Sequence, residues 1–87
     1  MPAPTPEYVA ALDTTLWAVV VPSSRGAGQA YRVSVRSYDG GPARVVLHST
    51  WRGGTQEGPL RAIAAVDLPA VIAALERARK YLAGTHR

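Results

Sequence analysis

The sequence predicts a single α+β domain, in which a four-stranded antiparallel sheet is followed by a C-terminal helix and preceded by a short helix. Three observations favour this class: side chains alternate over residues 31–38, a second alternating segment follows a glycine turn, and the C-terminal region carries an apolar stripe of helical period. With 87 residues the chain has room for one core. We expect the domain over residues 16–84, a tail and short helix at 1–15, and a tail at 85–87.

The composition is that of a folded globular protein. Hydrophobic residues make up 47% and charged residues 18% of the chain, and cysteine is absent, which excludes disulfides and cysteine zinc sites. The apolar run at 16–21 is too short to cross a membrane, and residues 1–5 lack the basic region of a signal peptide. We therefore expect a cytoplasmic, nucleoid-associated protein with no membrane partner. The arginine- and alanine-rich usage is typical of a bacterial, GC-rich genome.

The N-terminal elements are a short helix and a strand. Thr5 supplies a hydroxyl N-cap and Pro6 suits a first turn, which predicts a helix from there to Asp13. The β-branched run in residues 16–21 predicts the first strand, which Pro22 ends because it has no amide hydrogen. Residues 23–28 then form a flexible loop.

Two further strands, at 31–38 and 43–52, are predicted to share one polar face. Apolar and polar residues alternate in both, and the turn at 39–42 pairs them antiparallel. The side chains predicted on the core face are Tyr31, Val33, Val35, Val45 and Leu47. Those predicted on the opposite face are Arg32, Ser34, Arg36, Tyr38, Arg44, Val46, His48, Thr50 and Arg52.

The C-terminal part is predicted as a loop at 53–59, a final strand at 60–66 that carries Arg61, and a helix at 69–83 ended by Gly84. Glu76 and Lys80 are spaced as an i,i+4 ion pair on that helix. Because one sheet and one helix bury little apolar area, we expect a homodimer formed about the C-terminal helices. The helix stripe expected at its core is Val71, Leu75, Ala78 and Leu82.

The sequence offers little for catalysis. Neither His48 nor His86 has a carboxylate placed beside it, and no zinc-protease, phosphate-loop, paired-carboxylate or nucleophile-elbow pattern occurs. The glycines at 26 and 28 lack the rest of a dinucleotide fingerprint. We expect no enzyme activity, no cofactor and no metal.

The basic face favours a nucleic-acid partner. The net charge is +4 and the pI is about 10.1, which attracts anions. Guanidinium groups can follow the phosphates of a single strand while aromatic rings stack on its bases, and Tyr38 and Trp51 end the two long strands. The alternative is a solvated basic face with both rings in the core or at its rim. Strict alternation places Trp51 with Val45 and Leu47, so it reaches the basic face only through a twist or bulge.

The order and spacing of these segments resemble the transcriptional positive cofactor 4 family of single-stranded DNA-binding coactivators. The residues that carry the resemblance are Val33-Ser34-Val35-Arg36 followed by an aromatic residue and a glycine turn, a strand ending in Trp51, and a helix entered through Pro69. The resemblance covers about residues 31–82. It implies a four-stranded curved sheet followed by a helix, dimers about the helices, and single strands bound across the sheet.

The resemblance implies that Arg36 contacts the backbone or bases of the single strand, that Tyr38 stacks on a base, and that Trp51 also takes part in binding. His48 occupies the place of a basic residue of the family. The family is lysine-rich around Asp39 and over 59–63, where this chain keeps only Arg61, so affinity is expected to be weaker or shifted toward other arginines. The residues expected to bind nucleic acid are Arg32, Ser34, Arg36, Tyr38, Arg44, His48, Thr50, Trp51, Arg52 and Arg61.

The sequence therefore predicts a homodimeric, largely sequence-independent single-stranded DNA-binding protein that acts in transcription, replication or DNA repair, with transcription or repair proteins as further partners. RNA binding is a variant of this prediction, because phosphate tracking and stacking do not by themselves separate the two sugars. The alternative is a dimeric protein-interaction module of the same fold that does not bind DNA.

Overall fold

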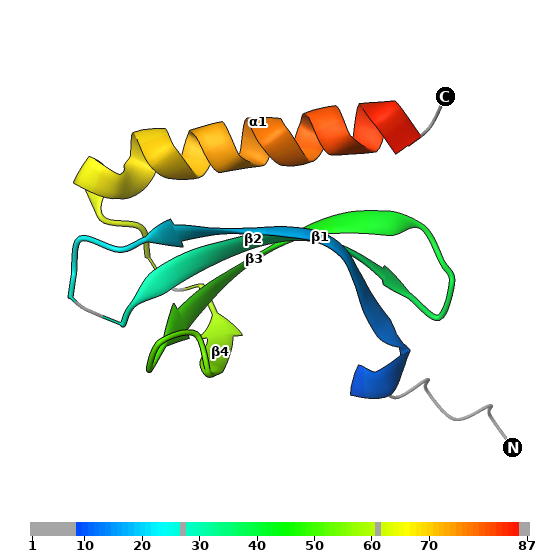
Figure 1. Ribbon diagram of the computed structural model, residues 1–87, viewed down its shortest axis with the longest axis horizontal. Helices are drawn as coiled ribbons and strands as arrows, with labels where there is room; N and C mark the ends of the chain where they lie inside the picture. Colours follow the sequence, from blue (N-terminus) through cyan, green and yellow to red (C-terminus); the bar gives the residue numbers. More distant parts are fainter. Residues whose placement is uncertain (1–8, 27, 61, 86–87) are drawn as a thin grey trace, which may run out of the picture.

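The computed structural model describes residues 9–26, 28–60 and 62–85 of the chain (Figure 1). Its strands form one antiparallel sheet in the order β1-β2-β3-β4, and α1 lies along one face of that sheet. The elements in chain order are η1 (Ala10–Leu12), β1 (Asp13–Pro22), β2 (Ala30–Tyr38), β3 (Ala43–Trp51), β4 (Gln56–Pro59), η2 (Ala65–Asp67) and α1 (Leu68–Thr85). The predicted four-stranded sheet followed by a helix is confirmed. The sheet is not strongly curled, whereas a curved sheet was expected.

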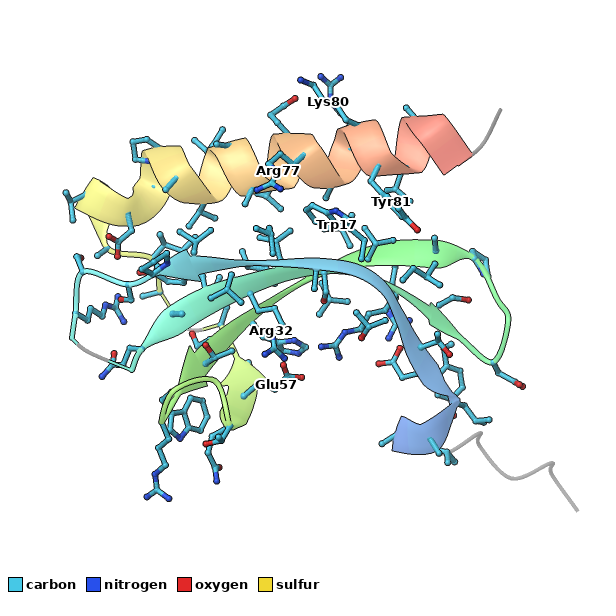
Figure 2. The ribbon with its side chains drawn as sticks, in the orientation of Figure 1. Trp17, Arg32, Glu57, Arg77, Lys80 and Tyr81 are labelled. Atoms are coloured by element: carbon cyan, nitrogen blue, oxygen red, sulfur yellow. The ribbon has the colours of Figure 1, made fainter. Side chains whose placement is uncertain are left out.

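The core lies between the sheet and α1. Val33 and Val35 of the central strand β2 are fully buried, and Val71 and Ala78 of α1 pack against the same cluster. Burying a valine side chain stabilises a fold by about 1.5–3 kcal/mol, so this small cluster accounts for much of the attraction between the two layers. Figure 2 shows Trp17 between the layers, where its ring stacks on Tyr81 with centroids 6.0 Å apart.

The strand register follows the alternation of the sequence. Val33 lies opposite Leu47 and Arg32 opposite His48, so the apolar and polar sets of the two strands meet on separate faces, as predicted. Val45 is nevertheless exposed, although it was expected in the core. The helix packs mainly over β1 and β2 and leaves this part of β3 uncovered.

The first strand is longer than predicted and contains an irregularity. The strand begins at Asp13, although a helix was expected to extend to that residue. Over the described positions that prediction is wrong, because only the short turn η1 precedes the strand. The residues before position 9, including the expected N-cap, lie outside the described part of the chain. A register shift between Thr15 and Trp17 separates two paired segments of β1.

The last strand is not where the sequence pattern predicted it. Residues 56–59, expected in a loop, form β4, and the strand expected at 60–66 is absent from the described residues of that segment. Gly53 and Gly54 have positive φ, which allows the chain to reverse its direction directly after β3. The next residues therefore pair with β3 as the antiparallel strand β4. Pro59 then ends β4 because proline has no backbone N–H to donate to the neighbouring strand. Farther along, the backbone N–H of Ala64 donates to the Tyr31 hydroxyl and not to a strand.

The final helix is one residue longer at its start and two at its end than predicted. It begins at Leu68 and runs past Gly84, which therefore does not end it. Glu76 pairs with Arg79 at 2.8 Å, not with Lys80 as the spacing suggested. None of the helices in the described part of the chain has the length and hydropathy needed to cross a membrane.

Candidate nucleic-acid interface

The sheet face opposite α1 carries a cluster of charged side chains that we call the arginine face. Its basic members come from β2 and β3, and the antiparallel register sets Arg32 opposite His48 and Arg36 opposite Arg44. Figure 2 shows Arg32 on the side of the sheet away from the helix. The arginine face consists of Asp13, Arg32, Arg36, Arg44, His48 and Glu57.

Two carboxylates bind the three guanidinium groups together. Glu57 accepts from Arg32 at 2.8 Å and from Arg36 at 3.1 Å. Asp13 accepts from Arg44 at 3.1 Å, and Arg36 Nη1 lies 3.5 Å from its Oδ2. Arg36 therefore links both acids, and the arginine face has a net charge of +1 when His48 is neutral.

Neither acid was predicted as part of this face. Glu57 enters it because β4 pairs with β3 and sets the glutamate opposite Thr50, whereas the sequence pattern placed it in a loop. Asp13 enters it because β1 extends to pair with the end of β2. Extending the first strand back to residue 13 would have revealed one acid, but no sequence signal distinguishes β4 from a loop.

The electrostatics of the face keep Glu57 ionised. Partial burial raises the pKa of this carboxyl, but the hydrogen bond from Arg36 and the positive charges of His48, Arg36 and Arg32 outweigh burial, so the pKa lies below the ordinary 4.5. At neutral pH the guanidinium groups of Arg32 and Arg36 are therefore paired with an ionised carboxylate. Such an arrangement is ordered but only weakly basic.

A hollow of about 340 Å³ opens within the arginine face, between Arg36, Arg44 and His48, with both acids and Val46 completing its wall. Nδ1 of His48 is buried and has no hydrogen-bond partner, and it lies 3.7 Å from Oε1 of Glu57. A buried ring nitrogen without a partner is costly, so this atom marks the hollow as a place for a further polar group.

Two of the residues predicted to bind nucleic acid are enclosed by the sheet. Ser34 is fully buried, and its Oγ accepts from Nε of Arg36 at 3.1 Å. Thr50 is also buried and donates to the carbonyl of Ala30 at 3.3 Å. Their short side chains therefore support the neighbouring strands and arginine and do not reach a ligand.

Two other predicted residues, Tyr38 and Arg52, lie away from the centre of the face. The hydroxyl of Tyr38 accepts from the backbone N–H of Val9 at 2.8 Å, which holds its ring beside the N-terminal turn. Arg52 is exposed in the turn after β3, where its φ is +54°. Arg61 lies outside the described residues.

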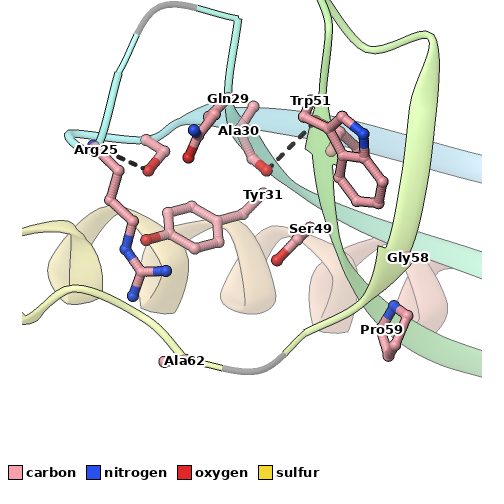
Figure 3. A pocket seen from close by; sticks show the side chains of 11 residues that line it. Arg25, Gln29, Ala30, Tyr31, Ser49, Trp51, Gly58, Pro59 and Ala62 are labelled. Carbon is pink, nitrogen blue, oxygen red and sulfur yellow. Dashed lines mark hydrogen bonds between the residues drawn. The ribbon is translucent and has the colours of Figure 1, made fainter.

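Trp51 is on the other side of β3 from the arginine face, since it alternates with Thr50. It is exposed, and its ring covers Gly58, where a Cβ atom would lie 3.0 Å from Cη2 of the indole. Figure 3 shows it at one end of a second hollow of about 340 Å³, with Arg25 and Tyr31 farther along the wall. The strict alternation of β3 therefore holds to its end.

Beside this second hollow, one hydrogen-bond network joins the sheet to the start of α1. The Asp67 carboxylate accepts from the Tyr31 hydroxyl at 2.8 Å and from the backbone N–H and hydroxyl of Ser24. Burial raises the pKa of Asp67, but these hydrogen bonds and the charge of Arg25 together bring it below the ordinary 3.8. The network is structural and was not predicted.

The predicted dimer stripe is mostly used within the chain. Val71 and Ala78 are buried against the sheet, and the partly buried Leu82 packs against the same core. Leu75 is the exposed member of that set. The apolar side chains that α1 does expose at i, i+4 and i+7 are Leu68, Ile72 and Leu75.

Among the described residues, no group of three or more histidines and acids could hold a metal ion. No protein-family model, no curated protein and no solved structure matches this chain. Function therefore has to be argued from the chemistry of the arginine face.

Proposed function

We propose that this protein binds single-stranded nucleic acid, DNA in the first place, through the arginine face. The observation that carries the proposal is the cross-strand array of Arg32, Arg36, Arg44 and His48 on a sheet face that α1 does not cover. Guanidinium groups are suited to phosphates because their planar donors match two oxygens at once. The overall charge of +4 adds long-range attraction.

A single strand fits this surface better than a duplex. Reading duplex DNA in the major groove needs a helix or a two-stranded ribbon that projects into the groove, whereas α1 lies flat on the sheet. A broad sheet face with basic groups can instead follow an extended backbone. The resemblance to the positive cofactor 4 family supports the same choice, and a role in transcription, replication or repair follows from that resemblance.

The proposal includes a homodimer about α1, with Leu68, Ile72 and Leu75 at its centre. Ile72 is 51% exposed and Leu75 36% exposed, and both lie on an exposed apolar stripe beside the helix residues Val71 and Ala78 that pack on the sheet. Two copies would present two arginine faces, which offsets the small number of guanidinium groups on each one.

The alternative, a dimeric interaction module without nucleic-acid binding, is favoured by one observation. Every arginine of the face already has a carboxylate partner. If these pairs are only structural, the face adds little affinity for phosphate.

Fluorescence anisotropy with a labelled single-stranded DNA, its duplex and the matching RNA separates these functions. We expect the single-stranded DNA to bind most tightly, with a strong salt dependence. Arg44→Ala should lower the slope of log K against log salt by about 0.7, since one phosphate contact is lost. Arg44 suits the test because its side chain is 42% exposed.

The matched control is Lys80→Ala, which removes an equal charge from the side of α1 that faces away from the sheet (Figure 2). It should leave the slope unchanged. Equal slopes for wild type and Arg44→Ala, or no binding of any oligomer, would favour the interaction module.

A further inference from the structure

Glu57 lies among three basic side chains, those of Arg32, Arg36 and His48. Its two oxygens accept from different arginines, Oε2 from Arg32 and Oε1 from Arg36, and Oε1 also faces the unpartnered Nδ1 of His48. A phosphate group offers the same kind of acceptor with one more oxygen and more charge. These basic groups of the arginine face therefore already surround an anion, and that anion is a side chain of the protein.

We propose that Glu57 is an internal competitor: its carboxylate occupies a phosphate site formed by Arg32, Arg36 and His48, and a phosphate of the bound strand displaces it. The biological meaning of this inference rests on the proposed function, but the site itself can be tested with phosphate alone. Because the Glu57 carboxylate must be displaced first, single weakly bound anions have low affinity for this site. Ligands that carry several phosphates have enough contacts to displace it.

The two acids of the face differ in a way that supports this role for Glu57 only. The Asp13 side chain is 4% exposed and lies between Arg36 and Arg44, so moving it would leave a buried charge without a partner. The Glu57 side chain is 31% exposed and stands on β4, an edge strand of four residues. Its carboxylate can turn into solvent without breaking the sheet.

The edge position also limits the cost of displacement. Exposed ion pairs contribute little to stability, because water replaces the lost partner. A phosphate that takes over both arginines and gives His48 Nδ1 an acceptor returns more contacts than Glu57 loses. A hydrogen bond from Nδ1 to the phosphate requires a proton on Nδ1. One neutral tautomer of the imidazole carries that proton, and the charged form does as well.

The test is Glu57→Gln, which removes the charge and keeps the shape, with Glu76→Gln as the matched control on the exposed side of α1. Anisotropy with a labelled oligothymidylate should show Glu57→Gln binding about fivefold tighter than wild type, since two exposed ion pairs no longer compete. Glu76→Gln changes the net charge equally and should change affinity by less than about twofold, because solvent screens distant charges.

A second measurement does not depend on nucleic acid. Thermal unfolding is followed in inorganic phosphate and in chloride at equal ionic strength, and phosphate should raise the melting temperature of Glu57→Gln more than that of wild type or Glu76→Gln. If Glu57→Gln gains phosphate stabilisation but no variant binds the oligomer, the phosphate site stands and the proposed function fails. If oligomers bind and Glu57→Gln is no tighter than Glu76→Gln, the competitor role is refuted and the proposed function remains.

Discussion

Removing the hydroxyl of Tyr31 should destabilise the fold although the ring stays in the core. The residue is 2% exposed, and its hydroxyl donates to Asp67 at 2.8 Å and accepts from the backbone N–H of Ala64 at 3.2 Å. Tyr31→Phe leaves the Ala64 N–H without its acceptor and deprives the Asp67 carboxylate of a donor. This one hydroxyl therefore links β2 to the connection that leads into α1.

The size of the effect follows from those two bonds. A typical hydrogen bond contributes about 0.5–1.5 kcal/mol net, so losing two should lower the free energy of unfolding by about 1–3 kcal/mol. For a domain of this size each kcal/mol moves the melting temperature by about 4–8 °C. Urea unfolding monitored by circular dichroism should show a lower midpoint with an unchanged m-value, since the surface exposed on unfolding stays the same.

Tyr38→Phe is the control, because it removes a hydroxyl that accepts one backbone N–H at an exposed site. We expect it to cost less than about 0.5 kcal/mol, as for most surface substitutions. The reasoning is refuted if Tyr31→Phe and Tyr38→Phe unfold at the same urea concentration, since the buried network would then contribute nothing.

Three further outcomes are expected. The lowered pKa of Asp67 gives a contribution to stability that is present above its ordinary pKa of 3.8 and is lost as pH falls through the lower folded value, so Asp67→Asn should flatten acid unfolding followed by circular dichroism. Gly58→Ala should push the indole of Trp51 outward and shift its emission to longer wavelength in a Trp17→Tyr background; an unshifted spectrum would contradict the contact. Ile72→Asp should give a folded monomer in sedimentation, whereas a monomeric wild type would refute the dimer.

The sequence predicted the central part of the sheet well because local alternation has a direct geometric meaning. Val33 and Val35 must leave β2 on the side opposite to Arg32 and Arg36, whatever the rest of the chain does. The helix stripe through Val71 and Ala78 was equally readable, since its period fixes one apolar side. The period does not predict what the apolar side packs against, because that depends on segments far away in the chain. In the structure it packs on the chain's own sheet.

The sequence itself thus determined the antiparallel pairing of β2 with β3 and the placement of Arg32, Arg36, Arg44 and His48 on one face, whereas Arg52, predicted with them, lies in the turn after β3. The position of β4, the extension of β1 and the two carboxylates that pair with the arginines were decided by the tertiary structure. Asp13 and Glu57 lie far from Arg36 in the chain and meet it only when the edge strands pair. Periodicity reports the side on which a residue lies, whereas the charge that it faces depends on contacts between distant segments.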